Sequence, residues 1–238
     1  MNLLLLHPED CHEPGLARLS GRRLQHVREV HRAAVGETLR VGLLGGDMGQ
    51  AEIVGLSEAE LVLRYTLEQA PPPKLPLILL LALPRPKMLK RILETVATMG
   101  VQRLVLMNSY RVEKSFWDSP WLQPESVREQ LLLGLEQGRD TVLPEVVLEP
   151  RFKPFVEDRL PALSAGTRKL VAHPVAAETC PVQVEEPVTL AIGPEGGFIP
   201  YEVDKLREQG FEAVHLGSRI LRVETAVPVL LSRLFPLA

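Results

Sequence analysis

Two glycine-bearing turns near the carboxyl end hold the residues best suited to bind a ligand. The first reads Gly193-Pro-Glu-Gly-Gly197 and the second reads Leu216-Gly-Ser-Arg219, and each follows a short apolar run. Glycine permits positive φ angles and lets a ligand approach the backbone, whose N–H and C=O groups can then bind it. Tight connections between a strand and a helix have the same composition, so glycine content alone leaves both interpretations open.

The segments around these turns predict a parallel α/β unit. Thr189–Ile192 and Ala213–Leu216 are short apolar runs typical of strands, and residues 200–209 between them have helical character. Alternation of strand, turn and helix places both turns at the carboxyl edge of a parallel sheet. Ligands of open α/β sheets bind outside that edge, so we expect the two turns to line one crevice.

Three consecutive prolines, Pro71 to Pro73, indicate a boundary within the chain. A stiff, extended spacer is typical between domains, so we expect domains over residues 1–70 and 77–238 with a linker at 71–76. In the first domain, short β-type runs predict a small antiparallel barrel. These runs are residues 3–6, 37–44, 50–56 and 61–65, and residues 16–35 predict one helix.

The second domain alternates strands with helices, which predicts the α/β class with a parallel sheet covered by helices. Leu77–Leu83 is continuously apolar, as expected of a strand buried on both faces. Residues 87–99 carry apolar side chains at a helical period that ends at Gly100. Further strands are expected over residues 101–107, 142–148, 169–172 and 188–192, with helices over 124–137 and 227–235.

Composition excludes several classes of protein. The 238 residues are 45% hydrophobic and 24% charged, with a net charge of −3. The two cysteines, Cys11 and Cys180, lie far apart and give neither a zinc-ligand spacing nor a disulfide framework, so no metal site is expected. No apolar run approaches the roughly 18 residues that a membrane span needs. We therefore expect a cytoplasmic protein that does not associate with membranes.

Basic side chains gather in two places. Residues 18–40 hold six arginines and two histidines against two glutamates, and residues 85–91 form a second basic group. Such clusters attract a polyphosphate backbone, although an isolated basic helix is more often a solvated surface. Aromatic residues make up only 5% of the chain, which favours recognition of folded RNA over stacking on single strands. The candidate RNA-binding residues are Arg22, Arg23, His26, Arg28, Arg85 and Lys87.

The two turns match neither the GxGxxG nor the GxxxxGK[ST] fingerprint, which disfavours a Rossmann dehydrogenase and a P-loop enzyme. The sequences of the two turns, taken together, resemble the motifs of a known family instead. GPEGGF at residues 193–198 with LGSRILRVETA at 216–226 is similar to the paired signature of the RsmE family, ribosomal RNA uridine-N3 methyltransferases of the SPOUT superfamily. Residues 99–114 and 136–144 resemble further motifs of that family, so the likeness covers nearly the whole chain. The departures are Thr95, Thr98 and Val223.

The resemblance implies a fold, a reaction and partners. The fold is a SPOUT-type α/β knot, a deep trefoil knot, preceded by a small PUA-like β-barrel. The reaction is methylation by S-adenosylmethionine (SAM) of N3 of a specific uridine of 16S rRNA, uridine 1498 in the family. The substrate is naked rRNA or the assembled small ribosomal subunit, and the enzyme is a homodimer. There are two alternatives. One is a SPOUT enzyme that methylates a different position of the RNA (ribose 2′-OH or another base), and the other is a non-catalytic rRNA-binding assembly factor.

Carried over by motif, the resemblance assigns the SAM site to the two turns. Backbone groups of glycine loops can bind adenine and ribose, with Ile220 and Leu221 covering the adenine. The third side is Ala172 with His173, although a histidine in this position is more often a simple strand end. The implied cofactor-binding residues are Ala172, His173, Ile192, Gly193, Pro194, Glu195, Gly196, Gly197, Leu216, Gly217, Ser218, Ile220, Leu221, Arg222, Thr225 and Ala226. Thr225 could instead cap the last helix.

The implied reaction requires that N3 of the acceptor uridine be made nucleophilic. Uridine N3 carries a proton and becomes nucleophilic when that proton leaves or when charge on O2 or O4 is stabilised. Arg222 and Arg139 are the candidates for charge stabilisation, and Glu224 or Glu136 could orient them or accept the proton. A structural Arg–Glu pair is the alternative. Because N3 lies on the Watson–Crick edge, the target must be unpaired or flipped out of its stack.

Overall fold

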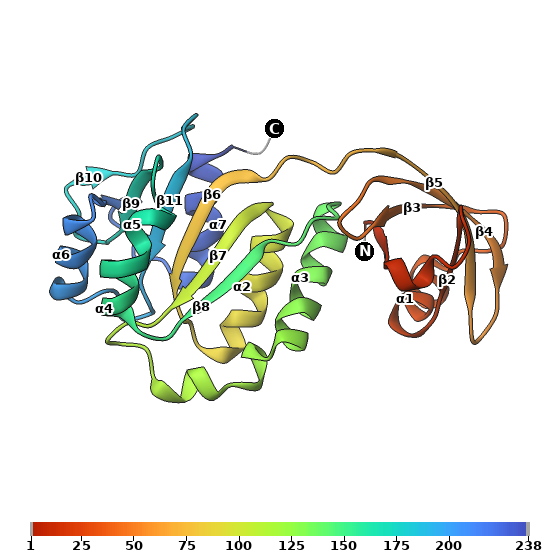
Figure 1. Cartoon of the computed structure of the whole chain (residues 1–238), viewed down its shortest axis with the longest axis horizontal. Helices are drawn as coiled ribbons and strands as arrows, with labels where there is room; N and C mark the ends of the chain where they lie inside the picture. Colours follow the sequence, from red (N-terminus) through yellow and green to blue (C-terminus); the bar gives the residue numbers. More distant parts are fainter. Residues whose placement is uncertain (1, 237–238) are drawn as a thin grey trace. The chain divides into compact units, whose positions relative to one another are not determined.

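A computed structural model describes residues 2–236, and its contacts form two compact units. One unit comprises the chain up to Pro73 together with Leu132–Leu143, and the other comprises Lys74–Leu131 and the chain from Pro144 onward (Figure 1). The predicted limits 1–70, 71–76 and 77–238 did not anticipate that residues 132–143 group with the first unit. The prolines connect strands that end at Gln69 and begin at Leu75.

A five-stranded sheet with the order β1-β3-β4-β5-β2 forms the first unit. Its strands are β1 Leu4–Leu6, β2 Leu16–Leu19, β3 Thr38–Leu43, β4 Met48–Leu56 and β5 Leu61–Gln69. The expectation of purely antiparallel pairing is wrong at one place, because β1 pairs with β3 in parallel. The other neighbours pair antiparallel, and their inward side chains, such as Ile53, Leu61 and Leu63, are fully buried.

The single helix predicted over residues 16–35 is wrong at both ends. Residues 16–19 form β2, and the helical part consists of α1 (Gly21–His26) followed by a π-helical turn, η2 (Val27–His31). Gly21 has a φ of +62°, a conformation that glycine adopts without strain and that separates the strand from the helix. Arg32 with a φ of +53° ends the helical part. A short 3₁₀ turn, η1 (Pro8–Asp10), lies between β1 and β2.

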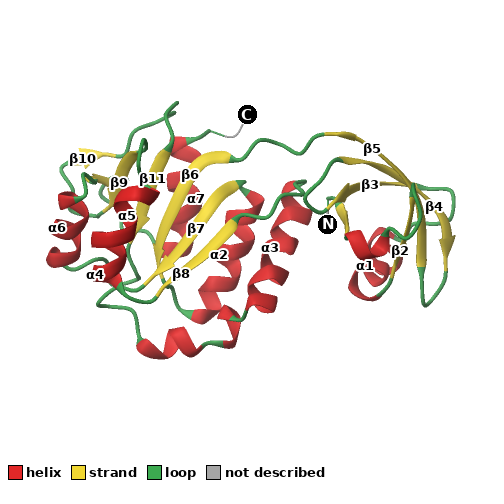
Figure 2. Cartoon of the chain, in the orientation of Figure 1, coloured by secondary structure: helices red, strands yellow, loops and turns green. Residues whose placement is uncertain are grey.

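The second unit contains a seven-stranded, entirely parallel sheet with the order β10-β12-β9-β11-β6-β7-β8 (Figure 2). Its strands are β6 Leu75–Ala82, β7 Val101–Met107, β8 Glu145–Glu149, β9 Arg168–Ala172, β10 Glu178–Thr179, β11 Val188–Ile192 and β12 Glu212–His215. The predicted α/β class is therefore confirmed. The strand expected over 142–148 begins three residues later, at Glu145.

Helices cover both faces of the parallel sheet. Figure 1 shows α2 (Pro86–Thr98) and α7 (Val223–Leu234) on one face, where they contact each other, and α4 to α6 on the other. The remaining helices are η3 Lys114–Asp118, η4 Pro120–Leu122, α3 Pro124–Gly138, α4 Phe152–Pro154, η5 Phe155–Arg159, α5 Leu160–Leu163 and α6 Pro200–Glu208. None of the helices described between residues 2 and 236 has the length and apolar character of a membrane span.

The local sequence explains how the main helices begin and end. The buried side chains of α2, which include Leu89, Ile92 and Val96, follow the helical period, and Gly100 with a φ of +72° stops the helix. The proposed cap at Thr225 is wrong in position. Arg222 is the residue before α7, so Thr225 lies within the first turn and donates its N–H to the Arg222 carbonyl at 3.0 Å.

Gly49 in β4 gives a test of the first unit's packing. A Cβ added there would collide with the backbone carbonyl of Thr66 on β5, and overpacking against rigid backbone costs about 1–3 kcal/mol. We expect Gly49→Ala to lower the free energy of unfolding in urea by that amount. Gly55→Ala in the same strand is the control, because its Cβ would lie 3.4 Å from the Val62 side chain, an ordinary contact. Equal stability of the two variants would contradict the packing.

Candidate functional site

A pocket lies at the carboxyl edge of the parallel sheet, where β9, β11 and β12 end side by side. Ala172 at the end of β9 is in register with both Ile192 on β11 and Val214 on β12, so the loops that follow these strands start together. The pocket has a volume of about 700 Å3, including space open to solvent. It is lined by Ala172, His173, Pro174, Ile192, Gly193, Pro194, Glu195, Gly197, Val214, His215, Leu216, Gly217, Arg219, Ile220, Leu221, Val223, Ala226 and Leu230.

The loop after β11 is tightly closed on itself. Gly197 has a φ of +73° and donates its N–H to the Pro194 carbonyl at 2.7 Å. A Cβ on Gly193 would lie 2.9 Å from the Phe198 nitrogen and 3.2 Å from the Gly197 carbonyl carbon. Glycine is required at both positions. Gly197 has a left-handed conformation, and a side chain on Gly193 would collide with backbone atoms. The loop is therefore a rigid wall made mainly of main-chain atoms.

The loop after β12 is more open. Gly217 has a φ of +114° and donates its N–H to Nδ1 of His215 at 2.9 Å. Ile220 lines the pocket with 83% of its surface exposed. A large aliphatic side chain left this exposed at a pocket is suited to cover a flat apolar group.

Most of the residues predicted to hold a cofactor lie together in this pocket. Twelve line it: Ala172, His173, Ile192, Gly193, Pro194, Glu195, Gly197, Leu216, Gly217, Ile220, Leu221 and Ala226. Gly196, Ser218, Arg222 and Thr225 belong to the same loops and to the start of α7 but not to the lining. The sequence analysis missed Pro174, Val214, His215, Arg219, Val223 and Leu230. Helical spacing could have identified Val223 and Leu230, since they share a face of α7 with Ala226.

His173 lines the pocket in surroundings that disfavour its protonated form. Burial lowers the pKa of His173 below its usual value, and the positive charge of Arg207 lowers it further. Its backbone N–H donates to the Val214 carbonyl at 2.9 Å, which ties the main chain at the end of β9 to β12. An imidazole that stays unprotonated adds no positive charge to a pocket whose lining also contains Arg219 and Glu195.

The candidate catalytic residues are placed differently. The side chain of Arg222 is 86% exposed, and its Nη1 lies 4.0 Å from Oε1 of Glu224. A pair at this distance with a solvated guanidinium contributes little to stability, which leaves the Arg222 guanidinium free for a ligand. Arg139 follows α3 in the first unit with a φ of +57°. Glu136, the other candidate, is buried and bound by an arginine of the first unit.

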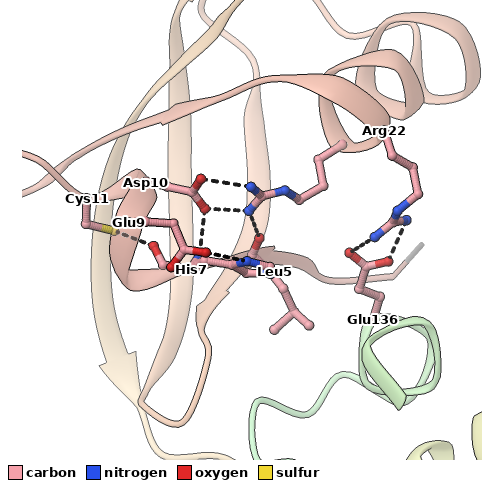
Figure 3. Close-up of polar contacts among 8 residues, drawn as sticks. Leu5, His7, Glu9, Asp10, Cys11, Arg22 and Glu136 are labelled. Carbon is pink, nitrogen blue, oxygen red and sulfur yellow. Dashed lines mark hydrogen bonds and ion pairs between the residues drawn. The ribbon is translucent and has the colours of Figure 1, made fainter. Parts of the chain in front are cut away.

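Two of the arginines predicted to bind RNA are engaged in ion pairs within the first unit (Figure 3). Arg23 donates to both carboxylate oxygens of Asp10 at 2.5 and 2.8 Å and to the Leu5 carbonyl at 2.8 Å. Arg22 donates two hydrogen bonds of 2.9 Å to Glu136. The Arg23 side chain is only 15% exposed. Both guanidiniums therefore serve the fold, and Arg23 is too enclosed to reach a large ligand.

The other candidate RNA-binding residues differ in exposure. Nε2 of His26 is buried and has no hydrogen-bond partner within residues 2–236, and burial lowers the pKa of its imidazole. Arg28 is exposed and lies 3.9 Å from the fully solvated Glu58. Arg85 and Lys87 are exposed at the start of α2, where the Arg85 N–H donates to Oε1 of Glu195 at 3.1 Å. The second basic group thus borders the glycine loop after β11.

Comparison with known proteins adds the family context. A family model described as an RNA methyltransferase domain matches residues 71–235. Ribosomal RNA small subunit methyltransferase E of Treponema pallidum is 31% identical over 233 residues, covering 95% of this chain and 87% of the relative. The protein of the same name from Synechocystis is 26% identical, covering 97% of this chain and 76% of the relative.

Two solved structures have similar folds. A methyltransferase from Legionella pneumophila, in complex with SAM, has a TM-score of 0.76 and 24% identity, covering 98% of this chain and 96% of that one. Ribosomal RNA small subunit methyltransferase E from Neisseria gonorrhoeae, bound to S-adenosyl methionine, has a TM-score of 0.74 and 19% identity, covering 97% and 95%.

The ion pair of Arg23 with Asp10 gives a stability prediction. Replacing Arg23 by Met leaves a carboxylate that is 7% exposed without its cation, and breaking such a pair from one side costs about 3–5 kcal/mol. We expect that loss in the free energy of unfolding measured in urea. Arg18→Met is the matched control, because Arg18 and Glu60 are both more than 40% exposed and such pairs contribute at most about 1 kcal/mol. Similar losses in the two variants would contradict the assignment.

Proposed function

This chain belongs to the ribosomal RNA small subunit methyltransferase E family, and from that membership we propose that it transfers a methyl group from SAM to N3 of a specific uridine of 16S rRNA. Membership rests on the 31% identity over 95% of the chain and on the family model over residues 71–235. The structural observation that carries the proposal is one pocket lined by both glycine loops at the carboxyl ends of β9, β11 and β12.

The pocket has the features that SAM requires. Adenine and ribose need hydrogen-bond donors and acceptors without charge, which the backbone at Gly193–Gly197 and Leu216–Gly217 can offer. Ile220 and Leu221 supply apolar surface for the adenine ring. The sulfonium of SAM is a cation, and the burial that lowers the pKa of His173 disfavours a second positive charge on that imidazole. These features support the proposal that SAM binds between the two loops.

When bound, SAM supplies an electrophilic methyl group that passes from sulfur to N3 in one in-line displacement. Positioning of the two reactants therefore provides much of the rate. As N3 attacks, its proton must leave, and negative charge must be stabilised on uracil O2 or O4. We assign the charge stabilisation to Arg222, which is exposed beside the pocket, and the orientation of Arg222 or acceptance of the proton to Glu224. Arg139 remains a further candidate for stabilising charge.

Resemblance to the same family also suggests how the chain is threaded, what the first unit does and which partners the protein binds. We propose that the second unit is threaded as a SPOUT trefoil knot, that the first unit is a PUA-like RNA-binding domain, and that two copies form a homodimer. The substrate is 16S rRNA, as free rRNA or within the assembled small subunit, in the cytoplasm. Exposed Arg28, Arg85 and Lys87 are the better candidates for phosphate contacts. Arg22 and Arg23 are bound closely to buried carboxylates, whereas the carboxylates nearest to Arg28 and Arg85 lie 3.9 and 4.0 Å away and are more exposed.

The product nucleoside tests the proposed reaction. We expect purified protein, SAM and small ribosomal subunits that lack the modification to yield 3-methyluridine, identified by mass spectrometry of the digested RNA. Free 16S rRNA in a parallel reaction distinguishes the two substrate forms. A product containing 2′-O-methylribose and no 3-methyluridine would overturn the assignment to N3. Absence of any methylated nucleoside together with retained rRNA binding would favour a non-catalytic factor.

Gly193 tests the cofactor site. Because a Cβ there would lie 2.9 Å from the Phe198 nitrogen, Gly193→Ala must displace the loop, and we expect SAM affinity measured by calorimetry to fall by at least about tenfold, or 1.4 kcal/mol. The affinity for rRNA should stay unchanged. Gly46→Ala in the first unit is the control, since its Cβ would meet only the Leu43 side chain at 3.4 Å or more. Unaltered SAM binding in Gly193→Ala would place the cofactor elsewhere.

A further inference from the structure

The loop that follows β7 lies against the glycine loop that follows β11. Arg111 donates a hydrogen bond from its guanidinium to the Gly196 carbonyl. A Cβ added to Gly196 would come within 2.8 Å of Cδ of Arg111, so the arginine stem covers this glycine closely. Gly196 sits between Glu195 and Gly197, which both line the pocket. The segment Ser109–Arg111 is thus adjacent to the proposed SAM site without being part of its lining.

A buried carboxylate holds this segment in place. Glu202 on α6 is 2% exposed and accepts hydrogen bonds from the Ser109 hydroxyl at 3.1 Å, the Tyr110 N–H at 2.7 Å and the Ile199 N–H at 3.0 Å. The first two donors belong to the loop after β7, and Ile199 directly follows the glycine loop. One carboxylate therefore connects the two loops, and charge-assisted bonds of this kind are about twice as strong as neutral ones.

Tyr110 combines a fixed backbone with a free side chain. Its N–H is bound to Glu202, while 79% of its surface is exposed. Among the hydrophobic side chains of residues 2–236, only a few others, such as Ile220 at the pocket, are as exposed. An aromatic side chain on a rigid loop beside a nucleotide-modifying site is suited to stack on a base that has left its helix.

We propose that Tyr110 and Arg111 form the subsite for the extruded nucleobase of the RNA substrate, with Glu202 as the residue that positions them. Tyr110 provides the stacking face, and the Arg111 guanidinium provides donors for a carbonyl oxygen of the uracil ring or for the adjoining phosphate. Arg85, whose backbone is bound to Glu195 of the same glycine loop, adds a second cation at this edge. The inference rests on the proposed function, because it requires an unpaired uridine as substrate.

The subsite is tested by binding of a short oligouridylate, compared with a base-free phosphodiester of the same length. Loss of one base–aromatic stack corresponds to roughly 5- to 150-fold in affinity. We expect Tyr110→Ala to weaken oligouridylate binding by that factor and to leave the base-free strand unaffected, while Tyr110→Phe binds like the parent protein. Unchanged oligouridylate binding in Tyr110→Ala, or equal weakening with both strands, would overturn the stacking role.

Arg111 and Glu202 are tested by kinetics with the full RNA substrate. We expect Arg111→Lys to raise KM for RNA and lower kcat/KM without altering SAM affinity, because a lysine lacks the planar fork. Arg103→Lys is the matched control, since Arg103 is bound to Glu145 on the neighbouring strand and has no part in the site. Glu202→Gln should likewise raise KM for RNA with SAM affinity retained, and equal loss of SAM and RNA binding would reduce Glu202 to a structural residue.

Failure of the subsite is distinguishable from failure of the proposed function. If the parent protein produces no 3-methyluridine from small subunits, the proposed reaction is wrong whatever the oligouridylate result. If the parent protein produces it and Tyr110→Ala retains both oligouridylate binding and activity, the subsite alone is wrong.

Discussion

The parallel register of β11 between β9 and β6 is the constraint on which the site depends. All five residues of β11 are buried, so the strand cannot slide without exposing apolar side chains or breaking ladder hydrogen bonds on both sides. Its end at Ile192 is level with Ala172 on β9 and Leu81 on β6. The loops that leave these strands therefore begin at one edge, and the glycine loop after β11 lies between its neighbours.

Side chains then set the distances between these loops. Glu195 accepts a hydrogen bond from the loop after β6, and Glu202 accepts two from the loop after β7. Arg111 adds a bond to the Gly196 carbonyl. The register of the strands fixes only where each loop starts. The two carboxylates and the arginine then fix the path of each loop relative to its neighbours. A reaction that depends on placing two substrates in line gains from loops that are fixed before either substrate binds.

The two arginines at the start of α1 show why charge pattern alone does not identify a nucleic-acid surface. Arg22 and Arg23 are adjacent in a strongly basic stretch, and both have carboxylate partners that are distant in the sequence, Glu136 and Asp10. A guanidinium paired with a buried carboxylate must lose that bond before it can bind a phosphate, and an uncompensated buried charge is costly. The positive charge of this stretch is thus partly neutralised by the fold.

The sequence was sufficient where structure follows from local pattern. Continuous apolar runs identified the buried strands β6 and β11, and the helical period of apolar residues identified α2. The glycine-containing sequences identified the two loops of the pocket. The sequence was insufficient where the interacting residues lie far apart along the chain. The parallel pairing of β1 with β3, the grouping of residues 132–143 with the first unit, and the bonds of Glu202 each join segments that no spacing rule connects. Residues 16–19 were misassigned because a helical stretch begins soon after them, at Gly21, and only the extended Ser20 and the positive φ of Gly21 separate the strand from the helix.

The closed loop after β11 and the exposed side chains around the pocket suit the two substrates of the proposed reaction in different ways. The loop after β11 is closed by the Gly197–Pro194 hydrogen bond and has no room for a side chain at Gly193, so it presents one fixed surface to a cofactor of constant shape. At the end of the loop after β12, the Arg222 side chain is largely exposed, and Tyr110 is exposed on the loop after β7. An RNA nucleotide must enter while attached to a large, charged strand, and exposed side chains on anchored backbones can meet it without the rigid wall having to move. In the proposed reaction, the rigid wall would therefore hold the donor, and the exposed side chains would receive the acceptor.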